Sequence, residues 1–201
     1  MNLEYSSGGK SPARISSEIL INKFLFELGN CESILEVGSK NSIHRNLLGN
    51  SNYVALDIVD NPNIDLVADV HNIPIRDNFF DLVLCIEVLE HLENPALAIS
   101  EMRRVLKKNG TLILSTRFIF PLHPDPKDYY RFTPDSLSFL CRNFKDVQIV
   151  PAGNILVSLI MIFLHSLPSK LQKHRLVSFF GKVPTKKNSR FACGYVLKAI
   201  K

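Results

Sequence analysis

Hydrophobic and polar positions along this chain follow two alternating patterns. Short, nearly continuous apolar runs are separated by stretches in which apolar residues recur every three or four positions. Runs of the first kind are typical of buried strands, and the second spacing is typical of amphipathic helices. The pattern predicts strands at 33–38, 53–58, 66–70, 80–86, 111–116, 147–150 and 195–200, and helices at 16–28, 95–107 and 134–142.

Residues that start and stop helices support these boundaries. Gly29 follows the first helix, and Pro95 suits the first turn of the second, which we expect Asn109-Gly110 to end. Thr133 is placed as an N-cap before Pro134 at the third helix. Apolar strands that alternate with helices predict a parallel sheet covered on both faces, in which ligands bind beyond the carboxyl ends of the strands.

Length and composition indicate one globular domain over residues 1–201. Apolar residues make up 46% of the 201 residues and charged residues 21%, which is typical of a folded protein with one core. The four cysteines are widely spaced and the first residues do not resemble a signal peptide. We therefore expect a cytoplasmic protein whose cysteines are buried free thiols, with membrane association as the alternative localisation.

The residues that follow the predicted strands contain a candidate binding site. Gly38, after the first strand, permits a tight turn close to a ligand. Asp57 ends the second strand, where a carboxylate can accept both hydroxyls of a ribose. Asp69 lies at the end of the third. Each feature is common when taken alone.

Two longer segments make the pattern more specific, namely FDLVLCIEVLEHL at 80–92 and EMRRVLKKNGTLILST at 101–116. With them the chain resembles the class I S-adenosylmethionine-dependent methyltransferases over roughly residues 33–150. The resemblance implies a Rossmann-like three-layer α/β sandwich. Its seven-stranded sheet would be mostly parallel with an antiparallel last strand.

The resemblance also implies S-adenosylmethionine as cofactor and assigns residues to its parts. Those near the methionine end would be Glu36, Gly38 and Ser39, with the backbone around Cys85 and Ile86. Asp57 would hold the ribose and Ile58 would pack on adenine, whose amino edge Asp69 and Val70 would recognise. Lys40 and Ser42 replace glycines usual in the family, so side chains would crowd the cofactor. A protein of this fold that only binds or regulates a partner is therefore the alternative function.

Residues 123–133 form the candidate wall of the acceptor site. They resemble the HPxPxDYYRFTP segment of methyltransferases met in polysaccharide and cell-envelope pathways. His123 is a candidate base and Arg131 a candidate clamp for phosphate or carboxylate, and His91 and Tyr130 complete the candidate catalytic set. Alternatively, Asp128, Tyr130 and Arg131 form a structural network that anchors the next helix.

A divalent metal site is a less favoured alternative. The spacing of Glu87, Glu90 and His91 would place these three side chains on one helical face. With His123 they resemble the metal-binding turn of ubiquinone-pathway O-methyltransferases, although many metal-free relatives carry the same run. We therefore expect S-adenosylmethionine to be the cofactor and expect no metal requirement.

Charge is divided unevenly along the chain. The net charge is +5, yet Asp146 is the last acidic residue and nine Lys or Arg lie between Pro168 and the C-terminus. The first 146 residues therefore sum to 15 − 19 = −4. Such a basic segment either faces an anionic partner or is a solvated surface. No base-amine methyltransferase motif or RNA-binding appendage is present in the sequence, so nucleic acid is not an expected partner.

The same region contains an apolar stretch at 155–167, which is too short to span a bilayer. We expect a helical insertion at about 153–185 between the last two strands. It would be either a lid over the pocket or a homodimer contact, or else it would lie in a membrane interface. The expected acceptor is a small molecule or a glycan- or lipid-linked compound.

Overall fold

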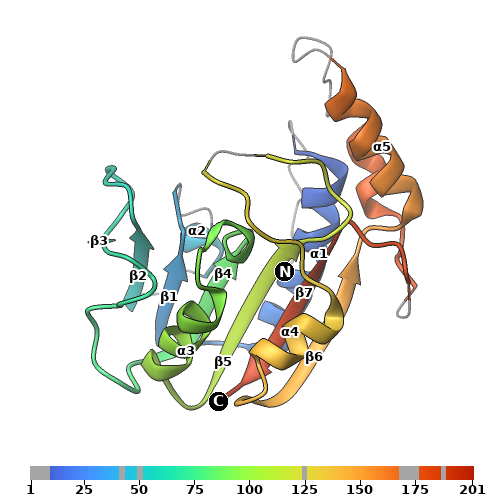
Figure 1. The fold of residues 1–201 in the computed structure, drawn as a ribbon. Coiled ribbons are helices and arrows are strands. Elements are labelled where there is room, and N and C mark those ends of the chain that lie inside the picture. The colour runs from blue at the N-terminus through green and yellow to red at the C-terminus, as the bar shows by residue number, and fades with distance from the viewer. Residues whose placement is uncertain (1–9, 41–43, 49–51, 124–125, 168–176, 187–188) are drawn as a thin grey trace.

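A computed structural model describes residues 10–40, 44–48, 52–123, 126–167, 177–186 and 189–201. Its centre is a seven-stranded sheet in the order β3-β2-β1-β4-β5-β7-β6 (Figure 1). All pairs among the first five strands of this order are parallel, and β7 runs antiparallel to both of its neighbours. The predicted fold class is confirmed. The strands are β1 (Ser33–Val37), β2 (Asn52–Asp57), β3 (Leu66–Val67), β4 (Phe80–Ile86), β5 (Leu106–Arg117), β6 (Lys145–Ala152) and β7 (Gly194–Ile200).

Helices cover both faces of this sheet and give three layers. The helices are α1 (Pro12–Leu28), α2 (Arg45–Leu48), α3 (Pro95–Val105), α4 (Pro134–Leu140) and α5 (Ile155–Ser166), with short 3-10 turns η1 (Leu89–His91) and η3 (Ser178–Lys182). In β4, Val83 and Cys85 pack with α3 and α4, whereas Leu82 and Leu84 pack with α1. This alternation divides the core into two parts, one on each side of the sheet.

Several predicted boundaries are wrong for local reasons. The first helix begins at Pro12 rather than residue 16, because the Ser11 hydroxyl caps it by accepting from the Arg14 N–H at 3.2 Å. The third strand stops at Val67, before the turn at Asp69. The last predicted helix ends at Leu140 rather than residue 142.

The largest boundary difference concerns Asn109-Gly110, which lies inside β5 and does not end a helix. The preceding helix stops at Val105, and Leu106 at once pairs with Phe80 of β4. Asn109 has φ 64°, and the register with β4 shifts between Phe80 and Leu82. Asn109-Gly110, which we expected to end the helix, therefore lies in the irregular first part of β5.

The insertion between β6 and β7 contains α5 and η3. The Ser16 hydroxyl of α1 donates to the Gly181 carbonyl of η3 at 2.8 Å. Gly181 lies so close to α1 that a Cβ added there would be 2.4 Å from the Pro12 carbonyl oxygen. One face of α5 packs on Ala13 of α1 and on Cys193. Together these contacts attach the described part of the insertion to the α1 side of the molecule.

Candidate functional site

The loops that follow four strands meet at one edge of the sheet, where the strand order reverses between β1 and β4. Gly38 N–H donates to the Leu56 carbonyl at 2.8 Å, and Ala68 N–H donates to the Asp57 carbonyl at 3.0 Å. Gly38 has φ 65°, and a Cβ there would lie 2.3 Å from Val88 Cγ2 in the loop after β4. Glycine is therefore required sterically at this junction.

Asp57 is fixed at the end of β2 by two backbone amides. Its Oδ2 accepts from Lys40 N–H at 2.9 Å and its Oδ1 from Val59 N–H at 3.0 Å. Each oxygen keeps a second lone pair, so the carboxylate can still accept ribose hydroxyls. The neighbouring Ile58 side chain is 70% exposed, which leaves an apolar surface beside the carboxylate.

Lys40 contributes to this site through its backbone. Its φ is 30° and its side chain is exposed, while its amide orients Asp57. Ser42 lies outside the described residues. The crowding expected from these two side chains therefore remains a prediction.

Glu36 is buried and holds the loop after β1 in place. It accepts hydrogen bonds from the Ser39 hydroxyl at 2.6 Å, from the Tyr53 hydroxyl and from the His44 ring. Burial by itself raises the pKa of Glu36, but these three hydrogen bonds outweigh it and bring the pKa below its ordinary value. Glu36 thus orders the turn that carries Gly38, and the sequence pattern gave no indication of the roles of His44 and Tyr53.

The remaining predicted cofactor residues lie around the same edge. Asp69 is half exposed and accepts from the His71 amide at 2.9 Å and from its ring at 2.6 Å. The hydrogen bond from the His71 backbone N–H is the main reason that the pKa of Asp69 is lowered. The side chains of Val70, Cys85 and Ile86 are buried in the core. At these positions only the backbone could line a ligand.

Glu87 forms a buried ion cluster directly after β4. Its carboxylate lies 2.6 Å from Arg117 Nη2 and 3.3 Å from Arg14 Nη1. Burial alone would raise the pKa of Glu87, but the two guanidinium groups outweigh it and lower the pKa. The prediction that Glu87, Glu90 and His91 share a helical face is wrong, because Glu87 has φ 59° and helical structure begins only at Leu89.

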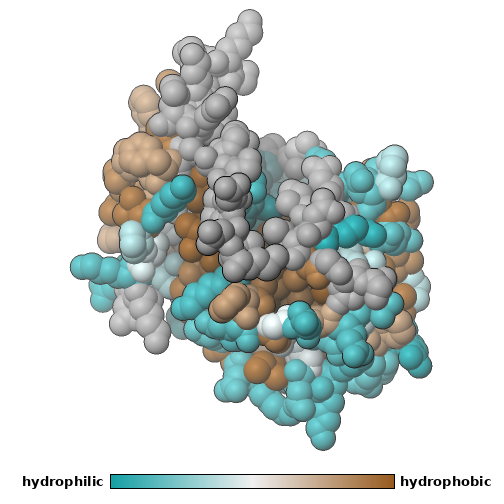
Figure 2. Space-filling view, turned by 180° about the vertical axis from the view of Figure 1, so that it is seen from behind, coloured by the Kyte–Doolittle hydropathy of each residue, from teal (hydrophilic) through white to brown (hydrophobic). Residues whose placement is uncertain are grey.

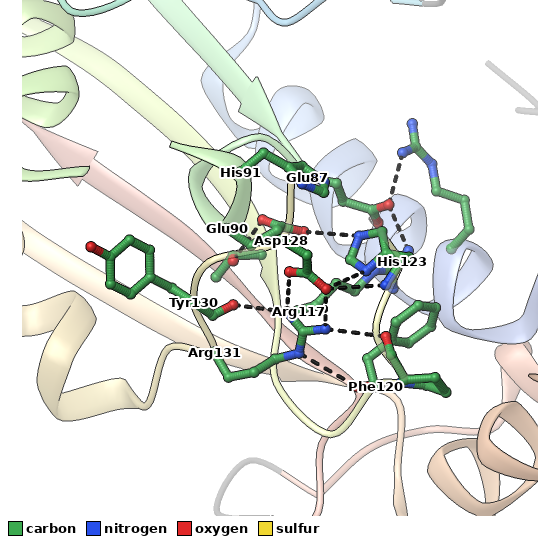
Figure 3. A network of polar contacts seen from close by, with 12 residues as sticks. Glu87, Glu90, His91, Arg117, Phe120, His123, Asp128, Tyr130 and Arg131 are labelled. Atoms are coloured by element: carbon green, nitrogen blue, oxygen red, sulfur yellow. Dashed lines mark hydrogen bonds and ion pairs between the residues drawn. The ribbon is translucent and has the colours of Figure 1, made fainter. Parts of the chain in front are cut away.

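Glu90, His91 and His123 come together on the other side of this cluster (Figure 3). One oxygen of the fully buried Glu90 accepts from the Thr116 hydroxyl at 2.8 Å, and the other lies 4.0 Å from His123 Nε2. The two imidazole rings are 4.8 Å apart. Since His91 Nδ1 lies 2.8 Å from the Lys127 carbonyl, that nitrogen donates its proton to the carbonyl, and Nε2 is the ring nitrogen left for another partner.

His123 is held against Asp128, whose side chain is almost fully buried. Its Nδ1 lies 3.1 Å from Asp128 Oδ2, and its backbone N–H donates to the same oxygen. Burial lowers the pKa of His123, with a contribution from His91, so the ring is neutral at neutral pH and can accept a proton. Hydrogen bonds from Arg131 lower the pKa of Asp128 to about 2.

Arg131 uses all five of its N–H groups within the protein. Two bind Asp128 at 2.5 and 2.6 Å, and three donate to the carbonyls of Phe120, Pro121 and Tyr130. To clamp a substrate it would have to break these bonds. The geometry therefore corresponds to the structural alternative for this residue, in which Arg131 anchors the loop.

Tyr130 also fastens the loop to the molecule. Its hydroxyl donates to the Glu93 carbonyl at 3.1 Å, and its amide donates to the Glu90 carbonyl at 3.2 Å. The hydroxyl is therefore directed to Glu93 rather than toward the two histidines. What the structure brings together is the pair of histidines with Glu90, supported by Asp128.

Buried polar atoms without a hydrogen bond concentrate in this region. Within the described residues there are seven such side-chain atoms, and six lie at or after the carboxyl ends of β4 and β5. Each costs about 1–3 kcal/mol unless a ligand or water satisfies it. The six atoms are Glu87 Oε1, Glu90 Oε1, Ser115 Oγ, Arg117 Nε, Arg117 Nη1 and His123 Nδ1, of which the last lies near Asp128 Oδ2 without hydrogen-bond geometry.

An apolar hollow of about 430 Å³ lies next to the histidines, between the loop after β5 and helix α5. The Phe120 ring forms part of its lining and lies 5.3 Å from the His123 ring and 5.3 Å from the His165 ring. Phe118 and Ile162 also line it. An acceptor with an apolar part could therefore lie beside the candidate base.

Arg14 and Arg117 were absent from the predicted site. Arg117 could have been found, because it directly follows the apolar run at 111–116 and so lies at the carboxyl end of a buried strand. Arg14 could not, because it reaches Glu87 from a helix that precedes the sheet in sequence.

Comparison with known proteins finds a family model that matches part of the chain. Residues 35–114 match the model described as "Methyltransferase domain". A ubiquinone biosynthesis O-methyltransferase of Dechloromonas aromatica is 42% identical over 50 residues, which are 25% of this chain and 19% of that protein. The matches to curated relatives span only 14% to 37% of each relative's length.

Solved structures share the fold over nearly the whole chain. A methyltransferase of Thermotoga maritima, described as a possible histamine N-methyltransferase, has a TM-score of 0.65 at 18% identity, covering 94% of this chain and 91% of that one. The 1,6-didemethyltoxoflavin-N1-methyltransferase of Burkholderia thailandensis, solved with S-adenosylhomocysteine, has a TM-score of 0.59 at 17% identity, covering 94% and 78%.

Proposed function

We propose that this chain is a class I S-adenosylmethionine-dependent methyltransferase and that it transfers a methyl group to a hydroxyl oxygen of its acceptor. The acceptor class that we propose is a small molecule or a glycan- or lipid-linked compound. The resemblance of residues 123–133 to a cell-envelope type of methyltransferase and the apolar hollow beside them support this class.

The residues at the edge of the sheet fit the cofactor. Asp57 retains lone pairs for a ribose, Ile58 offers an exposed apolar side chain to adenine, and Asp69 is half exposed in the adjoining turn. Gly38 allows close approach of the backbone. S-adenosylmethionine, when bound, would supply a methyl group whose bond to the sulfonium breaks as the nucleophile attacks, with S-adenosylhomocysteine as the leaving thioether.

The cluster of unsatisfied polar atoms is the observation that carries the proposal. It extends from Glu87, beside the cofactor edge, to the candidate base at His123, and polar groups of a cofactor and an acceptor could satisfy these atoms. His123 Nε2 and Glu90 Oε1 are 4.0 Å apart, so one hydroxyl oxygen at about 2.8 Å from each would bridge them. His123 would take the hydroxyl proton as oxygen attacks the methyl group, while Asp128 keeps the ring in position.

A metal would use the same three side chains. Ligand atoms of Glu90, His91 and His123 lie within 4.8 Å of one another, and the His91 bond to the Lys127 carbonyl is of the kind that orients a metal-binding histidine. Glu87, however, is held by Arg117 and Arg14 and does not join them. We therefore expect methyl transfer to be unaffected by EDTA. Loss of activity with EDTA that Mn²⁺ or Mg²⁺ restores would establish metal catalysis.

The first test is calorimetric titration of S-adenosylmethionine and S-adenosylhomocysteine. We expect micromolar binding that Asp57→Ala weakens at least tenfold, because the ribose loses its acceptor. Asp60→Ala is the matched control, since Asp60 is exposed on the same loop. If the folded protein binds neither ligand, the alternative function of binding or regulating a partner takes precedence.

The second test uses His123→Asn and requires a working acceptor. We expect unchanged cofactor affinity and a 10²- to 10⁴-fold lower rate of transfer, the usual range for general base catalysis. Because the pKa of His123 is lowered, the rate of the unaltered protein should hold at pH values somewhat below 6.5 and decline only as the ring becomes protonated. An unchanged rate for His123→Asn would rule out this residue as the base.

A further inference from the structure

Helix α5 has an apolar face that the described protein does not cover. Its buried side chains are those of Val157, Ser158, Met161 and Leu164. The opposite side carries apolar residues that are 44–63% exposed, namely Ile155, Leu156, Leu159, Ile162 and Phe163. Their spacing places them in one stripe along the helix, and α5 contains no Asp, Glu, Lys or Arg. We call these five residues the outer face of α5.

Surface helices normally present polar residues to water, so an apolar outer face indicates a partner surface. Figure 2 shows apolar residues gathered on the upper left of the molecule, where α5 lies in that view. The adjoining turn η3 packs against α5 through Phe180 and adds Phe179, which is 60% exposed. The apolar surface therefore extends beyond a single helix.

The described residues that follow α5 in sequence carry charge of one sign. Lys182, Lys186 and Arg190 are exposed in the described segments that follow, and the sequence contains no acidic residue after Asp146. An apolar surface beside cations fits the boundary between acyl chains and anionic headgroups of a lipid bilayer. We propose that the outer face of α5 docks the protein on an anionic lipid surface.

The dimensions support lying on a bilayer rather than crossing it. The 12 residues of α5 are about 18 Å long, whereas the hydrocarbon core is about 30 Å thick. None of the helices in the described residues is both long and apolar enough to span a membrane. A second copy of the chain is the alternative occupant, but the cations in the segments that follow α5 favour an anionic lipid surface.

The position of Ile162 connects this surface with the apolar hollow beside Phe120. Ile162 belongs to the outer face and also lines the hollow that reaches Phe120. If the proposed function holds, an amphiphilic acceptor could pass from the lipid surface to His123 along this side of α5. The docking itself does not depend on that function, because vesicle binding needs neither cofactor nor activity.

The experiment is co-sedimentation of the full chain with vesicles of phosphatidylcholine alone and of phosphatidylcholine with phosphatidylglycerol in equal amounts. We expect binding to the mixed vesicles only, weakened by salt. Leu159→Ser/Phe163→Ser should reduce the partition coefficient about tenfold or more, because two apolar anchors are lost. Lys182→Gln/Lys186→Gln should reduce binding to mixed vesicles by several-fold.

Matched controls are Phe139→Ser, on the opposite side of the sheet, and Lys108→Gln, since both side chains are exposed. Both controls should bind vesicles like the unaltered protein. All variants, including those in α5, should have a melting temperature near that of the unaltered protein.

Lack of binding by the unaltered protein, or equal binding by Leu159→Ser/Phe163→Ser, would overturn the proposal. So would sedimentation velocity that shows a dimer which this double variant abolishes, since a second copy would then cover the face.

Discussion

Two glutamates three residues apart have opposite electrostatic environments. Arg117 and Arg14 together lower the pKa of Glu87 against the cost of its burial, whereas burial and the charge of Glu87 raise the pKa of Glu90. Glu87 is therefore a permanent anion that neutralises buried cations. Glu90 can carry a proton at the point where we propose that a hydroxyl binds.

Replacing each glutamate by glutamine should show that Glu87 stabilises the fold, whereas Glu90 contributes little to stability. Glu87→Gln leaves Arg117 buried without its counter-ion, so we expect a loss of about 3 kcal/mol in the free energy of unfolding. Glu90→Gln keeps the acceptor for Thr116 and should cost less than about 1 kcal/mol. Urea unfolding measures both changes, with exposed Glu32→Gln as control. Equal losses for the two variants would contradict the assignment.

Gly38→Ala tests the junction between the loops after β1 and β4. The new Cβ would combine φ 65° with a 2.3 Å approach to Val88, so we expect a loss of about 2 kcal/mol and weaker cofactor binding. Val88→Ala in the same chain should relieve the clash but not the backbone strain. Partial recovery of stability in the double variant is the expected result, and full recovery would mean that strain contributes nothing.

Elements with a clear pattern of hydrophobic residues could be predicted from the sequence. Boundaries that depend on tertiary contacts could not. The strand at Phe80–Ile86 was predicted to the residue because it is apolar and buried at every position except Asp81. The start of β5 was missed because Leu106 pairs with Phe80 while residues 107–110 are polar or glycine.

The residues of the candidate site also fall into two groups, those that the sequence predicts and those that it does not. Positions next to strand ends, such as Asp57, follow from topology. The placement of Glu87 against Arg14 depends on a positive φ and on a distant helix, and neither has a sequence pattern.

Helix α4 is begun by a cap whose contribution can be measured. The Thr133 hydroxyl accepts from Ser136 N–H at 3.2 Å, and the Ser136 hydroxyl accepts from Thr133 N–H at 2.9 Å. Thr133→Ala should cost about 1 kcal/mol in unfolding free energy, whereas Thr133→Ser should cost little. If Ala and Ser are equivalent in urea unfolding, the cap does not stabilise this element.

Across the whole molecule, acid should unfold the protein through carboxylates that are stabilised as anions. Asp128 has a pKa of about 2 in the folded protein against an ordinary 3.8, so the unfolded chain binds its proton more readily. This carboxylate contributes about 2 kcal/mol that is complete above pH 5 and is lost as pH falls toward 2. In Asp128→Asn the stability curve should be lower at pH 7 and flatter below pH 5, whereas Asp60→Asn should leave it unchanged.

The position of β7 has a consequence for the order in which the molecule can be completed. β7 is the last strand in sequence yet lies between β5 and β6. Until residues 194–200 are synthesised, β5 keeps an open edge and β6 has no strand beside it. A chain cut after residue 190 would therefore have a slot bordered on both sides by unpaired backbone. Because that slot accepts one antiparallel strand in one register, a synthetic peptide of the missing segment could restore the sheet and serve as a switch for assembling the protein from two pieces.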